Sequence, residues 1–142
     1  MPSSGSDRSR RRRVLIVDDE PIIAELISDC LASSPEPLDV VKAGNGRAAL
    51  EAVERTRPDL VLLDINMPVM DGLETLKRLR VLHPRLPVLM ITGSDGASVA
   101  AALAAGAFGY LPKPMDLRYI VHLVGLALGT QPAHVVAADG RP

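Results

Sequence analysis

Several apolar segments of the chain are followed directly by polar residues of types that occur in catalytic and metal-binding sites. These junctions are Val14–Val17 before Asp18 and Asp19, Leu60–Leu63 before Asp64, Val88–Ile91 before Thr92, and Tyr110–Pro112 before Lys113. In the first three, a continuous apolar run stops at a carboxylate or a hydroxyl, which is typical of a strand buried on both faces of a parallel sheet. The pattern therefore predicts buried parallel strands with polar carboxyl ends.

Segments with helical spacing of their apolar residues lie between the strands. They start at Pro21, after Asn45-Gly46, after Asp71-Gly72, near Ala97 and near Leu117. One further strand is predicted over Leu38–Ala43, and the strand that leads to Lys113 is predicted over Phe108–Leu111. Strands that alternate with helices predict an α/β fold with a parallel sheet and helices on both faces. Such sheets bind ligands beyond the carboxyl ends of their strands, where the polar residues stand.

The two ends of the chain differ in composition from the part between them. Residues 1–13 are mostly Ser, Gly, Pro and Arg, and they cannot bury enough surface to order themselves, so we expect a disordered Arg-rich tail. We expect one domain over residues 14–128 and a flexible tail over residues 129–142. That second tail is too short for another domain, so any output should come from residues 14–128.

Charge is distributed unevenly along the chain. Five of the 16 basic residues and one of the 17 acidic residues lie in the first thirteen positions, which leaves a body with a net charge of about −5. An acidic body does not favour nucleic acid or an anionic membrane, but it suits a divalent cation. The arginine run could bind phosphates, but only 2% of the residues are aromatic and no stacking platform exists, so we expect a solvated tail.

The cysteine count and the hydropathy pattern limit the cellular setting. Cys30 is the single cysteine, so no internal disulfide is possible, and we interpret it as a small buried hydrophobe. No segment approaches the roughly 18 consecutive apolar residues of a membrane span. The basic start is not followed by the apolar core of a signal peptide. We therefore expect a cytoplasmic protein without a membrane partner.

Three carboxylates at one sheet edge favour a cation. Asp18, Asp19 and Asp64 would repel one another if they converged, unless a positive ion lay between them. Mg²⁺ prefers hard oxygen ligands and commonly takes one or two carboxylates, together with waters and phosphate oxygens. Asp19 and Asp64, with the backbone carbonyl of Asn66, would form half of such a ligand shell.

The same residues suggest phosphoryl transfer. Asp64 is the candidate nucleophile, and its attack on phosphorus would give an acyl phosphate. Such a transfer needs mainly positioning and neutralisation of the phosphoryl oxygens. Lys113 would supply a positive charge for this purpose, and Thr92 a hydroxyl donor.

The order of these residues resembles that in the receiver domain of two-component response regulators. The resemblance is carried by Asp18-Asp19, Asp64-Ile-Asn-Met-Pro68, Met70-Asp71-Gly72, Thr92-Gly93, Gly106-Ala107, Tyr110 and Lys113-Pro114. It covers roughly Val14 to Leu128. It implies a flavodoxin-like, doubly wound parallel sheet of five strands in the order 2-1-3-4-5, with five helices in three α/β/α layers.

The resemblance also implies roles for the individual residues. Asp64 would accept a phosphoryl group from the phosphohistidine of a sensor histidine kinase or a histidine phosphotransfer protein. Asp19 and Asp64 would bind Mg²⁺, and Asp18 would support the metal through water. Tyr110 would be the switch aromatic. Phosphorylation would then reshape the face formed by the fourth helix, the fifth strand and the fifth helix, where a downstream effector binds.

Other interpretations of the sequence stay open at this point. A phosphatase of the haloacid dehalogenase type also forms a phospho-aspartate, but it normally has a second acid two residues after the nucleophile, where Asn66 stands. A receiver-like scaffold would bind a partner without phosphorylation, although such a chain usually lacks one of the acids or the lysine. The chain could also be the input domain of a larger, DNA-binding regulator. We expect a stand-alone receiver without a turnover substrate.

The last predicted helix is more apolar than one buried stripe requires. Its apolar residues include Ile120, Val121, Leu123, Val124, Leu126 and Leu128. We expect most of them to pack in the core. The alternative is an interface, either with a second copy of the chain or with a partner.

Overall fold

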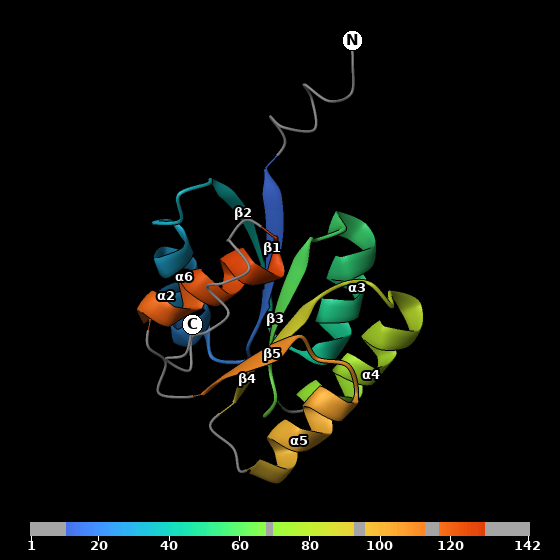
Figure 1. Cartoon of the computed structure of the whole chain (residues 1–142). Helices are drawn as coiled ribbons and strands as arrows, with labels where there is room; N and C mark the ends of the chain where they lie inside the picture. The colour runs from blue at the N-terminus through green and yellow to red at the C-terminus, as the bar shows by residue number, and fades with distance from the viewer. Residues whose placement is uncertain (1–10, 68–69, 93–95, 113–116, 130–142) are drawn as a thin grey trace.

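The computed structural model describes residues 11–67, 70–92, 96–112 and 117–129 (Figure 1). Strands and helices alternate throughout these residues. The strands are β1 (Arg12–Val17), β2 (Leu38–Ala43), β3 (Leu60–Asp64), β4 (Val88–Thr92) and β5 (Gly109–Pro112). The helices are α2 (Pro21–Leu31), α3 (Gly46–Thr56), α4 (Gly72–Leu82), α5 (Gly96–Ala104) and α6 (Leu117–Ala127).

The strands form one sheet in the order β2-β1-β3-β4-β5, and every neighbouring pair is parallel. Helices α2 and α6 pack together on one face, while α3, α4 and α5 cover the other (Figure 1). The chain therefore has three layers, and the flavodoxin-like topology predicted from the sequence is confirmed. The order reverses between β1 and β3, so a ligand site is expected at the carboxyl ends of these two strands.

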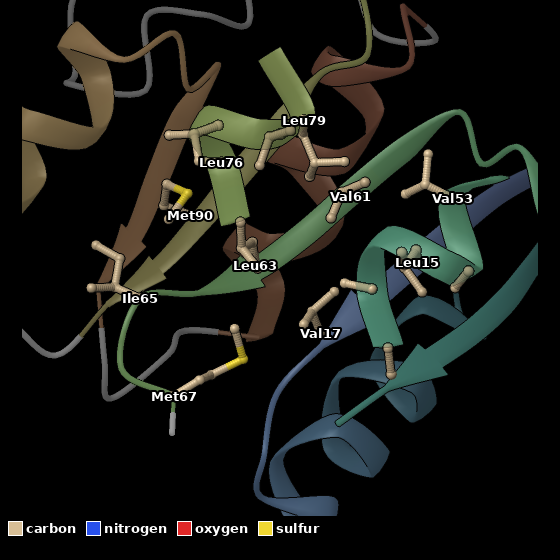
Figure 2. Packing of buried hydrophobic residues seen from close by; sticks show 14 of the residues in the cluster. Leu15, Val17, Val53, Val61, Leu63, Ile65, Met67, Leu76, Leu79 and Met90 are labelled. Carbon is tan, nitrogen blue, oxygen red and sulfur yellow. The ribbon is translucent and has the colours of Figure 1, made fainter. Parts of the chain in front are cut away.

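Alternate side chains of the central strands pack into two separate hydrophobic cores, one on each face of the sheet. Leu15 and Val17 of β1 belong to one cluster, which also contains Val53 of α3 and Leu76 of α4 (Figure 2). Val14 and Ile16 of the same strand pack toward α2 and α6, in a second cluster. All of these β1 side chains are fully buried, and burial of a side chain of this size contributes roughly 1.5–3 kcal/mol. Burial on both faces explains why the strands are apolar without alternation.

The helix starts follow the signals predicted from the sequence. Pro21 occupies the first turn of α2, where its missing N–H costs no hydrogen bond. The side chain of Asn45 accepts a hydrogen bond from the N–H of Ala48 at 2.8 Å and caps α3. Asp71 caps α4 by accepting from the N–H of Glu74 at 2.9 Å.

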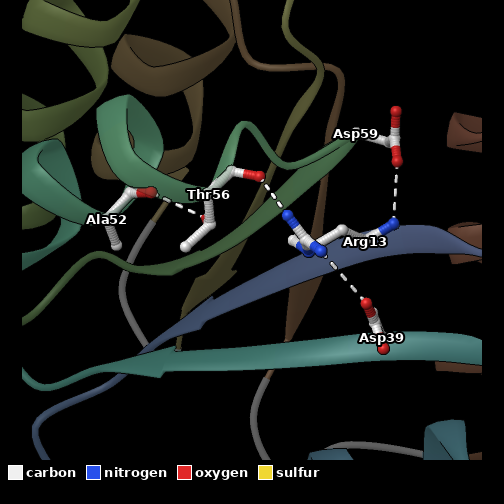
Figure 3. A network of polar contacts seen from close by, with 5 residues as sticks. All are labelled: Arg13, Asp39, Ala52, Thr56 and Asp59. Carbon is white, nitrogen blue, oxygen red and sulfur yellow. Dashed lines mark hydrogen bonds and ion pairs between the residues drawn. The ribbon is translucent and has the colours of Figure 1, made fainter.

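The predicted boundary of the N-terminal tail is wrong by two residues, because Arg12 and Arg13 belong to β1. The Arg13 N–H donates to Asp59 Oδ2 at 2.7 Å, and its guanidinium donates to Asp39 Oδ2 at 3.2 Å (Figure 3). The same guanidinium donates to the carbonyl oxygen of Thr56 at the end of α3. The order of Arg13 therefore comes from contacts with three other segments, which its tail-like composition conceals.

The last helix packs mainly into the core. Ile120, Val124 and Leu128 are buried, and Val121, Leu123 and Leu126 are half-buried. This burial favours core packing as the reason for its apolar character, and a homodimer through this helix stays a prediction. Cys30 is half-buried, and burial raises the pKa of its thiol. Among the described residues, no helix has the length and apolar character needed to cross a membrane.

Candidate functional site

Asp18 and Asp64 lie side by side at the carboxyl ends of two neighbouring strands. Strands β1 and β3 are neighbours, with Val17 opposite Leu63, so the residue after each of them lies at the same carboxyl edge. Asp19 follows Asp18 in the loop that leads to α2. One carboxylate oxygen from each of the three aspartates lies within 4.8 Å of the others. The predicted convergence of Asp18, Asp19 and Asp64 is therefore present.

The three carboxylates differ in exposure and support. Asp18 is 3% exposed and Asp64 is 1% exposed, whereas Asp19 faces solvent. The backbone N–H of Glu20 donates to Asp18 Oδ1 at 2.9 Å, and that of Asn66 donates to Asp64 Oδ1 at 3.2 Å. These hydrogen bonds hold the buried carboxylates of Asp18 and Asp64 in place at the carboxyl edge of the sheet. The exposed carboxylate of Asp19 makes the cluster of three aspartates accessible from solvent.

The donor set fits a hard divalent cation. Two charged carboxylates at this separation repel each other by on the order of 3–4 kcal/mol at an effective dielectric constant of about 20. A cation that shares their oxygens removes this cost, and Mg²⁺ commonly binds through one or two carboxylates while it keeps several waters. Asn66 is exposed and follows Asp64 by two residues, and its carbonyl as a further ligand stays a prediction.

Thr92 ends β4 next to the acidic cluster. It is 2% exposed, and it follows Ile91, which lies opposite Asp64 in the pairing of β3 with β4. The N–H of Ile65 donates to the carbonyl oxygen of Ile91 at 3.0 Å, which carries this pairing one residue beyond Asp64. The Thr92 hydroxyl is therefore on the strand end adjacent to the candidate phosphoacceptor.

Tyr110 lies on β5, opposite Met90 of β4, and its side chain is 43% exposed. It therefore stands on the strand next to Thr92 with a ring that is open to solvent. Lys113, the remaining predicted site residue, lies outside the described residues.

Two glycines contribute to the site in a way that the sequence analysis missed. A β-carbon at Gly72 would lie 2.2 Å from the carbonyl oxygen of Asp64, so only glycine lets α4 start against this strand end. A β-carbon at Gly46 would lie 2.2 Å from Thr75 Oγ1, where the start of α3 meets α4. The sequence marks both residues only as helix starts, because the approaching atoms, the Asp64 carbonyl oxygen and Thr75 Oγ1, belong to other elements of the fold.

Comparisons with known proteins agree with this geometry. The family model described as the response regulator receiver domain matches residues 14–125. A protein-glutamate methylesterase/protein-glutamine glutaminase from Nocardioides is 44% identical over 108 residues, which are 74% of this chain and 30% of that protein. The probable transcriptional regulatory protein TcrX from Mycobacterium tuberculosis is 42% identical over 109 residues, which are 76% of this chain and 46% of that protein.

Solved structures of similar proteins have the same fold. The chemotaxis protein CheY4 from Vibrio cholerae is 31% identical, with a TM-score of 0.77 over 84% of this chain and 100% of that one. The receiver domain of NtrX from Brucella abortus is 30% identical, with a TM-score of 0.77 over 83% of this chain and 99% of that one. By contrast, the matched segments make up 30% and 46% of the two sequence relatives named above, which are longer proteins.

Proposed function

This chain belongs to the family of response regulator receiver domains, and we propose that it is a phosphorylation-dependent switch of a two-component phosphorelay with Asp64 as its phosphoacceptor. Receiver domains are phosphoacceptor signalling domains that interact with histidine kinases and effector domains. The observation that carries the proposal is the convergence of Asp18, Asp19 and Asp64 at the β1–β3 edge. The donor would be the phosphohistidine of a sensor kinase or of a histidine phosphotransfer protein.

Asp64 would attack the phosphorus with one carboxylate oxygen. The bond from phosphorus to the histidine nitrogen breaks as the bond to the Asp64 oxygen forms, and the product is an acyl phosphate. Bound Mg²⁺ would neutralise charge on the phosphoryl oxygens. Asp19 and Asp64 would hold it directly, with the carbonyl of Asn66, while Asp18 would act through water. The hydrogen bond from the Asn66 N–H keeps the orientation of the Asp64 carboxylate fixed.

Thr92 and Lys113 would respond to the new group. A phosphoryl group adds roughly two negative charges and strong acceptor oxygens. The Thr92 hydroxyl would donate to one of them and the Lys113 ammonium would pair with another. Movement of Thr92 toward Asp64 would leave space for Tyr110 to rotate inward from its 43% exposed position. The face of α5, β5 and α6 would change shape, and an effector protein would recognise the change.

The chemistry is self-modification without a turnover substrate. The chain would form and hydrolyse its own acyl phosphate, and we infer that it is not an enzyme in the usual sense. Asn66 at the second position after Asp64 is unfavourable for a phosphatase of the haloacid dehalogenase type. The convergence of the three acids argues against a scaffold that binds its partner without phosphorylation. We infer a cytoplasmic location from the class of kinase that would supply the phosphoryl group.

Labelling with a small phosphoryl donor tests the proposal. Incubation with acetyl phosphate and Mg²⁺ should add one acid-labile phosphoryl group per chain, and Asp64→Ala should remove this labelling. Glu74→Gln, a change of an exposed acid on α4, is the matched control and should label normally. Full labelling of the Asp64→Ala variant would refute the assignment.

A further inference from the structure

Helices α3 and α4 border an apolar groove on the outer surface of the molecule. The groove has a volume of about 380 Å³ and is lined by Leu50 of α3 and by Lys77, Arg78, Val81 and Leu82 of α4. The side chain of Val81 is 81% exposed and that of Leu82 is 57% exposed. By contrast, Leu76 and Leu79 of the same helix are fully buried in the core between α4 and the sheet. Val81 and Leu82 therefore form an exposed apolar patch on α4, away from the core and beside Leu50 of α3.

The charges around this groove are mainly basic, although the body of the chain is acidic. Lys77 and Arg78 line the groove itself, and Arg78 pairs with Glu74 at 2.9 Å. A second cavity of about 570 Å³ shares Leu82 with the groove and is lined by Arg57 and Arg85 among other residues. The basic and apolar residues thus form one continuous surface at the end of α4.

Two acids of this region, Glu54 of α3 and Asp59 of the second cavity, each have a hydrogen-bond partner. Glu54 Oε2 lies 2.7 Å from His83 Nε2, and Asp59 Oδ2 accepts the N–H of Arg13 at 2.7 Å. Within the part of the chain that the structure describes, Lys77, Arg57 and Arg85 have no carboxylate in an ion pair with their side chains. The surface consequently offers positive charge beside an open apolar contact area.

We propose that this groove docks an acidic amphipathic helix of a partner protein. A helix laid between two helices presents apolar side chains at i and i+4 along one stripe, which fits an apolar concavity lined by Leu50, Val81 and Leu82. Carboxylates beside that stripe lie next to Lys77 and the arginines at the end of the groove. An added strand is not favoured, because α3 and α4 separate this surface from the sheet edges.

Docking at this groove is separate from the proposed phosphorylation switch. The switch face involves α5, β5 and α6, whereas the groove belongs to α3 and α4. The proposal therefore does not depend on Asp64, and the two can fail independently. Substitution of Val81 should leave labelling of Asp64 by acetyl phosphate unchanged.

Two designed peptides test the proposal. Both form a helix with leucines at i and i+4 along one stripe, and they differ only in whether the other positions carry glutamate or lysine. NMR titration of the isotope-labelled full chain with the acidic peptide should change the chemical shifts of Leu50, Val81 and Leu82. Its affinity should exceed that of the basic peptide by about tenfold or more, and the difference should shrink at high salt.

Single substitutions test whether the peptide binds at the groove or at other exposed apolar residues. Val81→Glu and Lys77→Glu should each weaken binding of the acidic peptide by about tenfold, because one places a charge in the groove and the other reverses a charge on it. Ile22→Glu, at a 75% exposed position on α2, should leave the affinity unchanged. Preserved amide spectra of the variants show that their fold is intact.

Three results would overturn the proposal. The first is that neither peptide shifts the groove residues. The second is equal affinity for the acidic and the basic peptide. The third is self-association of the chain that Val81→Glu abolishes in sedimentation, because a second copy would then be the occupant of the groove.

Discussion

Gly72 lies directly against the backbone of Asp64, such that a β-carbon at position 72 would stand 2.2 Å from the Asp64 carbonyl oxygen. The N–H of Gly72 also donates to the carbonyl oxygen of Ile65 at 2.8 Å. The first residue of α4 is therefore in contact with the strand end that carries the candidate phosphoacceptor. A displacement of the first turn of α4 would therefore press on this strand end, and the contact links the start of the helix to the chemistry of the site.

Substitution of Gly72 tests this contact. Gly72→Ala should lower the free energy of unfolding by about 1–3 kcal/mol, because the strand end must move to admit a methyl group. It should also slow labelling by acetyl phosphate, since Asp64 would move with its backbone. Urea unfolding and the labelling rate measure the two effects. Gly44→Ala is the control, because a β-carbon there would meet nothing within 4 Å, and an equal effect of both substitutions would contradict this explanation.

Neutralisation of one carboxylate should have opposite effects with and without Mg²⁺. Asp18→Asn removes a like charge beside buried Asp64, so without the ion the free energy of unfolding should rise by about 1 kcal/mol. With Mg²⁺ the wild-type chain should gain stability that the variant largely lacks. Thermal unfolding with and without Mg²⁺ measures both. Asp29→Asn, at an exposed position on α2, should change neither value, and an equal Mg²⁺ response of Asp18→Asn would argue against the cation site.

Arg13 should contribute far more to stability than Arg11 of the same arginine run. Arg13→Ala removes the guanidinium contacts with Asp39 and with the carbonyl oxygen of Thr56, and should lower the free energy of unfolding by about 1–3 kcal/mol. Arg11→Ala, at an exposed position just before β1, should change it by less than about 0.5 kcal/mol. Urea unfolding of both variants decides the matter, and equal stabilities would show that the Arg13 contacts contribute nothing.

Phosphorylation should bury Tyr110. The chain has two tyrosines and no tryptophan, so Tyr119→Phe leaves Tyr110 as the single fluorophore of its kind. Quenching of its fluorescence by a soluble quencher should fall after treatment with acetyl phosphate and Mg²⁺, because the ring moves from its 43% exposed position into the space beside Thr92. Thr92→Val in the same background should keep the ring exposed. Unchanged quenching in the phosphorylated chain would remove Tyr110 from the switch.

The sequence predicts the elements and the acidic cluster well for one physical reason. Strands buried on both faces are apolar throughout, so the residues that end them, such as Asp64 and Thr92, are conspicuous. Parallel pairing then brings those ends to one edge without any knowledge of side-chain contacts. Asn45 and Asp71 mark their helices by local hydrogen bonds, which a sequence also records.

Features that depend on contacts between distant segments could not be predicted in the same way. Arg13 has the composition of a tail, and its order comes from its place in β1 and from contacts with Asp39, Asp59 and the end of α3. Gly72 is a helix start by its local sequence, but its close approach to Asp64 depends on how α4 returns to β3. The exposed Val81 and Leu82 continue the apolar pattern of α4, and only packing separates them from the core.

Direct chemical mapping of the acyl phosphate tests the central claim. Borohydride reduces an aspartyl phosphate to homoserine, which peptide mass spectrometry locates to a single residue. After treatment with acetyl phosphate, homoserine should appear at position 64, and only when Mg²⁺ is present. Homoserine at Asp18 or Asp19, or equal conversion at Asp64 in a chelating agent, would contradict a phosphoacceptor that depends on a cation held by the three converging aspartates.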